Sequence, residues 1–288
     1  MLMNEERKQI VEYGRKLFQS GLCKGTAGNI SVFDRESGLM AISPSGIDYM
    51  DIKVDDIVIM NTSGKVVDGN CKPSSEYNMH LAVYDTSDAA AVVHAHSMYC
   101  TTFACMNQPI KAIHYGIASA HTHLIPVVPY ATYGSLELAE MVKASMKDYT
   151  GLALLLANHG IITWGNSLAQ AYNVCENAEL CAEIMWRCQC AGQAVILSES
   201  EINKVINKFE NYGQAAAEKK AINSSTIDII GYSKISAVLF LCFKSVQKLV
   251  SSVENDIILI ILTINIVKIS NGAGFNQLNY RIEVTKEE

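Results

Sequence analysis

The segment AAAVVHAH, residues 89–96, is an unbroken apolar run that ends in two histidines separated by one residue. A short, continuous apolar run of this kind is typical of a buried strand. Because side chains alternate along a strand, His94 and His96 would project from the same face, where two neutral imidazoles can bind one cation. On its own, the pair is explained slightly better by hydrogen-bonded core histidines or by chance.

A second apolar run, LALLLA at 152–157, leads into Asn158-His159-Gly160. It predicts another buried strand, which places His159 at the point where the strand meets a turn. Gly160 would relax the backbone of that turn. Histidines at strand ends are common, so this fragment alone indicates little.

A carboxylate occurs in the fragment Ser74-Ser75-Glu76, which precedes YNMHLAVY. Either serine could cap a helix there, with Glu76 in its first turn, and this fragment alone predicts no more than that. Combined with the three histidines, however, Glu76 completes the donor set of a catalytic Zn²⁺ or similar divalent ion that is open to substrate. A glutamate beside a metal can also transfer protons.

Two loops of small residues, GTAGN (25–29) and SPSG (43–46), adjoin the short strand-like runs ISVF and LMAI. Small residues with free backbone N–H groups can bind an oxyanion such as phosphate. Neither loop fits GxGxxG or the P-loop pattern, so the sequence does not support nucleotide binding. Each loop by itself favours an ordinary turn.

Helical patterns alternate with these runs. Residues 4–20 and 167–191 show apolar positions every three or four residues, and Ser198 followed by Glu201 predicts a capped last helix that reaches about Tyr212. The longer pattern places Leu168, Ala171, Val174, Ala178, Cys181 and Met185 on one stripe. The class is α/β or α+β, and local pattern does not choose between them.

Composition excludes several functional classes. The chain has 288 residues, a net charge of −6 and nine cysteines without a CxxC pair, which is typical of a reducing cytosol. The N-terminal segment lacks an apolar signal-peptide core, so we expect a cytoplasmic protein. The small net negative charge argues against binding to nucleic acid or to an anionic membrane.

The composition changes near residue 222, beyond which there is no histidine, proline or tryptophan. We therefore predict a domain at 1–214 and a C-terminal extension of unknown role at 215–288. The extension contains two apolar runs, 237–243 and 257–267, and both are shorter than the roughly 20 residues that span a bilayer.

Eight motifs in order carry a family resemblance over residues 1 to about 214. The chain resembles the class II aldolase/adducin-head family through GTAGNIS (25–31), ISPSGIDY (42–49), KPSSEYNMHLAVY (72–84), AVVHAHSMYCT (91–101), KAIHYGIASA (111–120), PYATYGSLELAE (129–140), LLLANHGIITWG (154–165) and KFENYG (208–213). The resemblance implies a single-domain, three-layer fold with a central, mostly antiparallel sheet flanked by helices.

The resemblance also implies a set of site residues. One Zn²⁺ per subunit would be bound by Glu76, His94, His96 and His159, with Glu76 also the proton carrier. Tyr115 and Tyr212 would assist catalysis, Tyr115 by reaching in from a neighbouring subunit of a homotetramer with inter-subunit active sites. The phosphate of a small sugar-phosphate substrate would be held by Thr26, Gly28, Asn29, Ser45, Gly46, Ser74 and Ser75.

The implied activity is reversible, zinc-dependent cleavage of L-fuculose 1-phosphate to dihydroxyacetone phosphate and L-lactaldehyde. Alternatives within the fold are a deoxypentulose-phosphate aldolase, an L-ribulose-5-phosphate 4-epimerase and a methylthioribulose-phosphate dehydratase. A non-catalytic adducin-like interaction module is disfavoured because the three histidines and Glu76 are intact. His121 and His123 have no assigned role, and a surface pair is favoured over a substrate contact.

Overall fold

The computed structural model describes residues 1–209. The predictions for Tyr212 and for the extension at 215–288 lie outside the described residues, and the domain boundary between 214 and 215 stays a prediction. Within residues 1–209, no helix is both long and apolar enough to cross a membrane.

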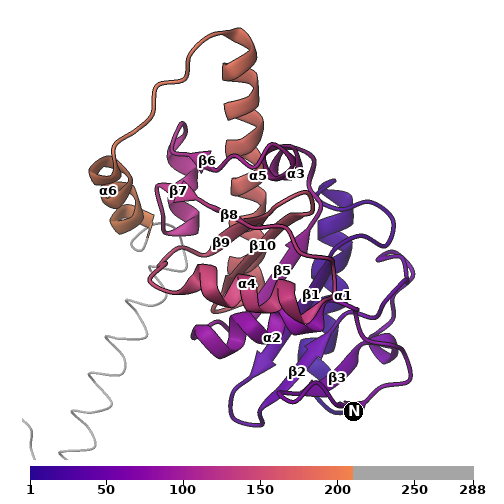
Figure 1. Cartoon of the computed structure of the whole chain (residues 1–288). Coiled ribbons are helices and arrows are strands. Elements are labelled where there is room, and N and C mark those ends of the chain that lie inside the picture. The colour runs from indigo at the N-terminus through magenta and orange to yellow at the C-terminus, as the bar shows by residue number, and fades with distance from the viewer. Residues whose placement is uncertain (210–288) are drawn as a thin grey trace, which may run out of the picture. The chain divides into compact units, whose positions relative to one another are not determined.

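The fold is mixed α/β, with an eight-stranded sheet at its centre (Figure 1). Every pairing in this sheet is antiparallel except that of its last two strands, which is parallel. The strand order is β4 (Val66–Asp68), β3 (Val58–Asn61), β2 (Leu39–Ile42), β1 (Asn29–Asp34), β5 (Ala91–Ala95), β10 (Gly160–Gly165), β9 (Ala153–Leu156) and β8 (Val127–Val128). A separate pair is formed by β6 (Ile110–Lys111) and β7 (Leu124–Ile125).

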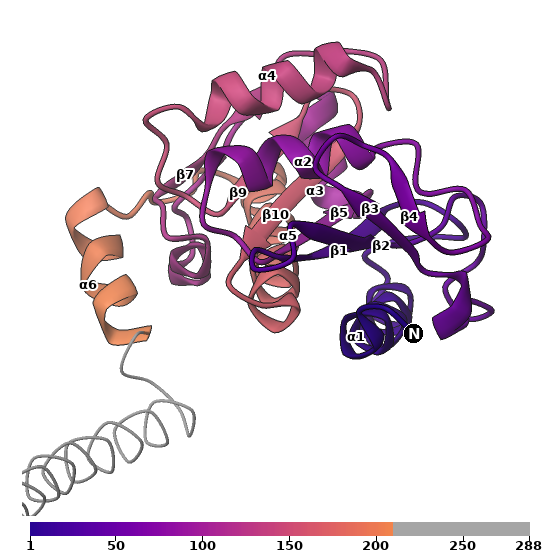
Figure 2. The same ribbon diagram turned by 90° about the horizontal axis from the view of Figure 1, so that it is seen from below.

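Helices cover both faces of the sheet, and each face has its own apolar core. Figure 2 shows α2 (Tyr77–Thr86) and α4 (Leu136–Met146) on one face and α1 (Asn4–Gln19) on the other. Helices α3 (Met98–Cys105) and α5 (Leu168–Ala191) pack on the same face as α1. The remaining helices are η1 (Val54–Asp56), η2 (Tyr115–Ala120) and α6 (Glu199–Phe209), and α6 packs against η2. The expected three-layer arrangement, with a mostly antiparallel sheet, is confirmed.

The elements expected from periodicity are present with small shifts at their ends. Helix α1 covers 4–19 of the predicted 4–20, and the predicted strands at 89–96 and 152–157 shorten to β5 and β9. All six residues on the predicted stripe of α5 are buried. At the start of α6, the Ser198 hydroxyl accepts a hydrogen bond from Glu201 N–H at 3.3 Å, while the Glu201 carboxylate pairs with Lys204.

Candidate metal centre

Four side chains from three separate segments of the chain converge beside the central strands. His94 lies in β5 and His96 directly follows that strand, His159 lies in the turn between β9 and β10, and Glu76 immediately precedes α2. One ligand atom from each of the four lies within 4.8 Å of all the others. Among residues 1–209, this is the group of His, Cys, Asp and Glu side chains whose spacing could hold a metal ion.

The distances place nitrogen and oxygen atoms around one point. His94 Nε2 lies 2.9 Å from His96 Nε2 and 3.3 Å from Glu76 Oε2. The other carboxylate oxygen, Glu76 Oε1, lies 3.2 Å from His159 Nε2. The three imidazole rings are inclined edge-to-face, with centroids 4.7 to 4.9 Å apart. Three imidazoles and one carboxylate are the donor types of a catalytic zinc site.

Backbone contacts and unpaired atoms show that these residues fit a cation. His94 Nδ1 lies 2.9 Å from the Ile161 carbonyl, so Nδ1–H donates to it and leaves the Nε2 lone pair directed into the cluster. Glu76 Oε1 is buried and accepts no hydrogen bond from any described residue. Because a buried carboxylate oxygen without a partner is costly, a bound divalent ion would satisfy it.

The electrostatic state of the cluster suits metal binding. Burial, reinforced by the neighbouring His94, lowers the pKa of His96 and of His159 to about 4, so both imidazoles are neutral at pH 7. Burial alone would raise the pKa of Glu76, but the adjacent His94, His159 and Asn29 hold that pKa far below its usual range. Neutral imidazoles and an ionised carboxylate are the ligand forms that a metal requires.

The backbone at two of these positions differs from the prediction. Glu76 is the residue before α2 rather than in its first turn, and the Ser74 hydroxyl accepts its N–H at 3.3 Å. The sequence predicts that Gly160 relaxes the turn before β10, but it is Asn158 that adopts the left-handed conformation there (φ 53°). Gly160 instead permits close packing, since a Cβ there would lie 2.4 Å from the Ala95 carbonyl oxygen.

The two small-residue loops and the segment before α2 are joined to one another. Ser45 N–H donates to the Lys72 carbonyl at 2.9 Å, and Ser74 N–H donates to the Ser43 carbonyl at 3.0 Å. The backbone amides of Ser45 and Ser74 are therefore already paired. The side chains of Thr26, Ser45 and Ser75 are exposed, as is Gly46, so these residues are accessible to a ligand.

The first loop reaches the cluster through Gly28 and Asn29. Gly28 has φ +80°, and a Cβ there would lie 2.6 Å from the His94 carbonyl oxygen, so the loop passes close against the end of β5. Asn29 is buried, and its Nδ2 donates to Glu76 Oε2 at 2.9 Å. The structure thus brings a predicted phosphate-binding residue into contact with a predicted metal ligand.

Tyr115 is not part of the cluster. It begins η2 and is 54% exposed, and its ring contacts are with His114 at 4.5 Å and Phe209 at 6.4 Å between centroids. Within a single chain, the structure therefore does not bring this predicted catalytic residue together with Glu76.

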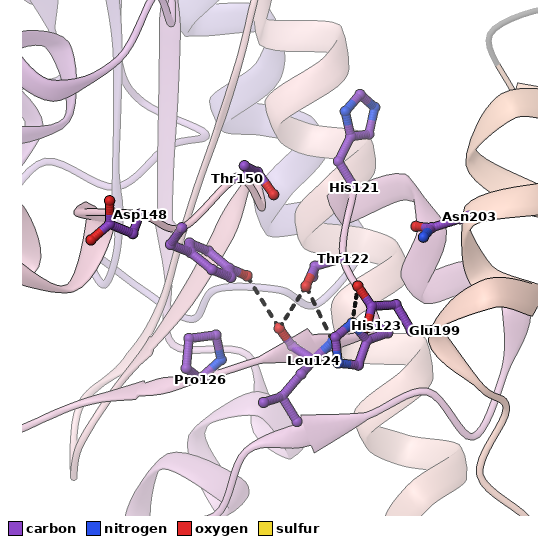
Figure 3. Close-up of a pocket in the computed structure, with 10 residues that line it drawn as sticks. His121, Thr122, His123, Leu124, Pro126, Asp148, Thr150, Glu199 and Asn203 are labelled. Atoms are coloured by element: carbon purple, nitrogen blue, oxygen red, sulfur yellow. Dashed lines mark hydrogen bonds and ion pairs between the residues drawn. The ribbon is translucent and has the colours of Figure 1, made fainter.

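His121 and His123 line a different pocket, with a volume of about 330 Å³ (Figure 3). The pocket shares no residue with the metal-type cluster, that is, Glu76, His94, His96 and His159. His123 Nδ1 lies 3.9 Å from Glu199 Oε1, and the two side chains are 45% and 67% exposed. Figure 3 shows the His121 ring directed away from His123, so the two do not form a chelating pair.

Two residues that the sequence analysis did not select contact this region. His80 is fully buried and hydrogen-bonds Asn29, and Glu179 of α5 accepts three hydrogen bonds at the start of α3, next to His96. His80 follows Glu76 by one helical turn, a spacing that could have drawn attention to it. Glu179 gave no comparable signal, because its contact depends on the packing of two helices.

Comparison with known proteins yields consistent relatives. The model of the class II aldolase and adducin N-terminal domain matches residues 8–186. A 5-deoxy-D-ribulose 1-phosphate aldolase of Bacillus thuringiensis serovar kurstaki is 45% identical over 215 residues, which are 74% of this chain and 100% of that protein. An L-fuculose phosphate aldolase of Haemophilus influenzae is 38% identical over 211 residues, 73% of this chain and 95% of the relative. A solved structure of an L-fuculose 1-phosphate aldolase matches with a TM-score of 0.70 at 44% identity, covering 73% of this chain and 98% of that one.

Proposed function

The chain belongs to the class II aldolase and adducin N-terminal domain family, and we propose that it cleaves a ketose 1-phosphate to dihydroxyacetone phosphate and a short aldehyde. Its relatives are named aldolases, and class II aldolases depend on a metal. The observation that carries the proposal is the convergence of Glu76 with three histidines. An interaction module would have no need of such a buried, metal-ready cluster.

We propose that His94, His96, His159 and Glu76 hold one Zn²⁺ per subunit. The N₃O donor set and the unpaired Glu76 Oε1 support this assignment. When bound, the ion supplies Lewis-acid polarisation of the substrate's carbonyl and hydroxyl oxygens.

Glu76 is the proposed proton carrier. Cleavage breaks the bond between C3 and C4 of the ketose and leaves the bonding electrons on the C3 side, so C3 must then be protonated. Glu76 is ionised and is held by Asn29, and its second oxygen has no hydrogen-bond donor. A carboxylate in that position can carry a proton to C3 and remove it in the reverse direction.

The proposed phosphate site consists of residues from three adjoining loops. They are Thr26, Gly28, Asn29, Ser45, Gly46, Ser74 and Ser75. The pairing of the 43–46 loop with residues 72–74, and the Asn29–Glu76 hydrogen bond, support a single site next to the cluster. Holding the phosphate there would supply binding energy remote from the reacting bond.

Tyr115 is proposed to act from a neighbouring subunit of a homotetramer, where it exchanges the proton of the C4 oxygen, and Tyr212 is proposed as a second, assisting tyrosine. The exposure of Tyr115, away from its own chain's cluster, supports this. A sharp test mixes two inactive variants, Tyr115→Phe and Glu76→Gln, during refolding or co-expression. Shared sites predict that activity returns in the mixture, because some sites then receive both intact residues. If each site lies within one chain, the mixture stays inactive.

The identity of the aldehyde product is the finer part of the proposal. The 45% identical relative favours 5-deoxy-D-ribulose 1-phosphate as the first substrate to test. L-Fuculose 1-phosphate is the second, supported by the 38% identical relative and by the matching solved structure. Both sugars end in a methyl group and would release dihydroxyacetone phosphate.

The deciding experiment measures dihydroxyacetone phosphate released from each sugar by metal-analysed protein. Wild-type protein is compared with His94→Ala and with chelator-treated protein. Release that disappears in both controls is the expected result, and the ratio of kcat/KM values ranks the sugars. Zinc-loaded, folded protein that cleaves neither sugar would refute the proposal.

The extension at 215–288 is proposed to be dispensable for this activity. Support comes from the 45% identical relative, all of which is matched by 215 residues of this chain. A variant that ends at residue 214 should keep its kcat and its assembly state. Loss of either would show that the extension takes part.

A further inference from the structure

A buried chain of hydrogen bonds runs from the α2 face of the sheet to Glu76. Tyr84 Oη lies 2.6 Å from Ser31 Oγ, which lies 2.6 Å from His80 Nδ1. On the other side of the imidazole, His80 Nε2 lies 2.5 Å from Asn29 Oδ1. Asn29 Nδ2 then donates to Glu76 Oε2 at 2.9 Å. Two elements contribute to this chain: α2 provides Tyr84 and His80, and β1 provides Ser31 and Asn29. The chain ends at Glu76, the residue that precedes α2.

The ionised carboxylate fixes the direction of every hydrogen bond. Because Glu76 can only accept, its partner must be the Asn29 amide nitrogen, so Asn29 Oδ1 faces His80. His80 Nε2 must therefore carry a hydrogen and donate it.

The protonation state of His80 fixes the rest of the chain. Full burial, followed by repulsion from His94, lowers the pKa of His80 to about 3, so the ring is neutral at pH 7. A neutral ring that is protonated at Nε2 accepts at Nδ1, so Ser31 donates to it and Tyr84 donates to Ser31. All the donors point towards Glu76, an arrangement in which each hydrogen bond strengthens the next.

We propose that His80 is a positioning residue for Glu76: its Nε2–H locks the Asn29 amide in the one orientation that donates to the carboxylate. This inference rests on the proposed function of Glu76 as metal ligand and proton carrier. Without the His80 donor, the Asn29 amide is free to turn its oxygen towards Glu76, where it would repel the carboxylate. His80 hydrogen-bonds Ser31 and Asn29, and of these two only Asn29 bonds Glu76, so the effect of His80 on Glu76 passes through Asn29.

Two substitutions distinguish the effect of losing the hydrogen-bond donor from the effect of losing the volume of the ring. The amide of Gln reaches the position of the imidazole Nε2, so His80→Gln keeps a donor to Asn29, whereas the shorter His80→Asn reaches only the position of Nδ1. A matched control is His121→Asn, because His121 lines a pocket that shares no residue with the cluster and has φ +53°, a conformation that Asn tolerates. For each full-length variant, we would measure Zn²⁺ affinity by chelator competition, kcat and KM for 5-deoxy-D-ribulose 1-phosphate and for L-fuculose 1-phosphate, and thermal stability.

His80→Asn should lower kcat and Zn²⁺ affinity by about 10- to 100-fold, the range observed when residues behind a metal ligand are changed, with KM close to wild type. His80→Gln should recover most of the loss, and His121→Asn should match wild type. Equal impairment of His80→Asn and His80→Gln, or a change in stability alone, would overturn the proposal. If wild-type protein binds Zn²⁺ but cleaves neither sugar, the proposed function fails, while the affinity ratio of His80→Asn to wild type still decides the positioning role.

A measurement on the unaltered protein keeps the test independent of whether His80→Asn folds. Nitrogen-15 NMR of histidine-labelled protein distinguishes a protonated from an unprotonated ring nitrogen. The proposal requires that His80 be protonated at Nε2 and unprotonated at Nδ1 at pH 7. The opposite tautomer would overturn it.

Discussion

The start of α3, two residues after His96, is capped by the carboxylate of Glu179 from α5. The effect of removing this carboxylate on stability can be worked out from its contacts. Glu179 Oε2 accepts from Ser97 Oγ at 2.7 Å and from Cys100 N–H at 2.8 Å, while Oε1 accepts from Tyr99 N–H at 2.8 Å. Ser97 and Cys100 are fully buried, so their donors would find no water to replace the carboxylate. Three donors at a helix N-terminus thus depend on one side chain of α5.

The expected cost follows from these contacts. A hydrogen bond to a charged acceptor contributes about 1.5–3 kcal/mol, and three that share one half-buried carboxylate contribute less than their sum. We expect Glu179→Ala to lower the free energy of unfolding by about 3 kcal/mol. For a domain of this size, that corresponds to a decrease in Tm of about 6–12 °C. Glu179→Gln keeps one acceptor oxygen but turns an NH₂ group towards a donor, so we expect it to cost about half as much.

Urea unfolding of the full-length variants, measured in chelator, gives the stability without bound metal. We expect Zn²⁺ affinity to fall by no more than about tenfold, because only His96 adjoins α3 while the other three ligands are positioned by β5, the β9–β10 turn and the start of α2. An alanine variant within about 0.5 kcal/mol of wild type would refute the reasoning, because neutral surface substitutions fall in that range.

Three further perturbations probe the site. Glu76→Gln should leave the fold intact and lower kcat by about 10²- to 10⁴-fold in the dihydroxyacetone phosphate assay, and an unchanged kcat would exclude Glu76 as the proton carrier. Burial lowers the pKa of His80 to about 3 in the native chain. As the pH falls below 6.5, the unfolded chain therefore takes up a proton at His80 while the native chain does not, and stability is lost. Between pH 7 and pH 5, His80 should therefore lower the free energy of unfolding by about 2 kcal/mol. In His80→Gln this contribution should be absent when urea unfolding is measured in chelator at the two pH values. An identical pH dependence in the variant would contradict the burial argument. Gly28→Ala combines a left-handed φ with a Cβ 2.6 Å from the His94 carbonyl oxygen, so it should cost of order 1–3 kcal/mol in urea unfolding and weaken Zn²⁺ binding, whereas wild-type values for both would show that the loop can move away.

The sequence predicts which side chains form the cluster of Glu76, His94, His96 and His159 better than it predicts how they are held. Alternation along a strand places His94 and His96 on one face, and the periodicity of α5 predicts its buried residues, because both signals are local. Close approaches between distant segments leave no local pattern. Asn158 adopts the left-handed conformation in the turn before β10, while Gly160 is needed where the backbone packs on Ala95. The pairing of His80 with Asn29 likewise depends on long-range packing of α2 on the sheet.

The register of the central strands specifies the core and the candidate metal centre together. Asn29 of β1 lies directly opposite His94 of β5, and the next pair along is Ile30 with Val93. Opposed residues point to the same face, and successive pairs point to opposite faces. Ile30 and Val93 are buried in the core on the α1 side, so Asn29 and His94 must turn towards α2 and Glu76. A slip of one residue between β1 and β5 would bury a polar group in that core as well as separate Asn29 from Glu76. The apolar pairs that stabilise the sheet therefore also enforce the geometry of the site.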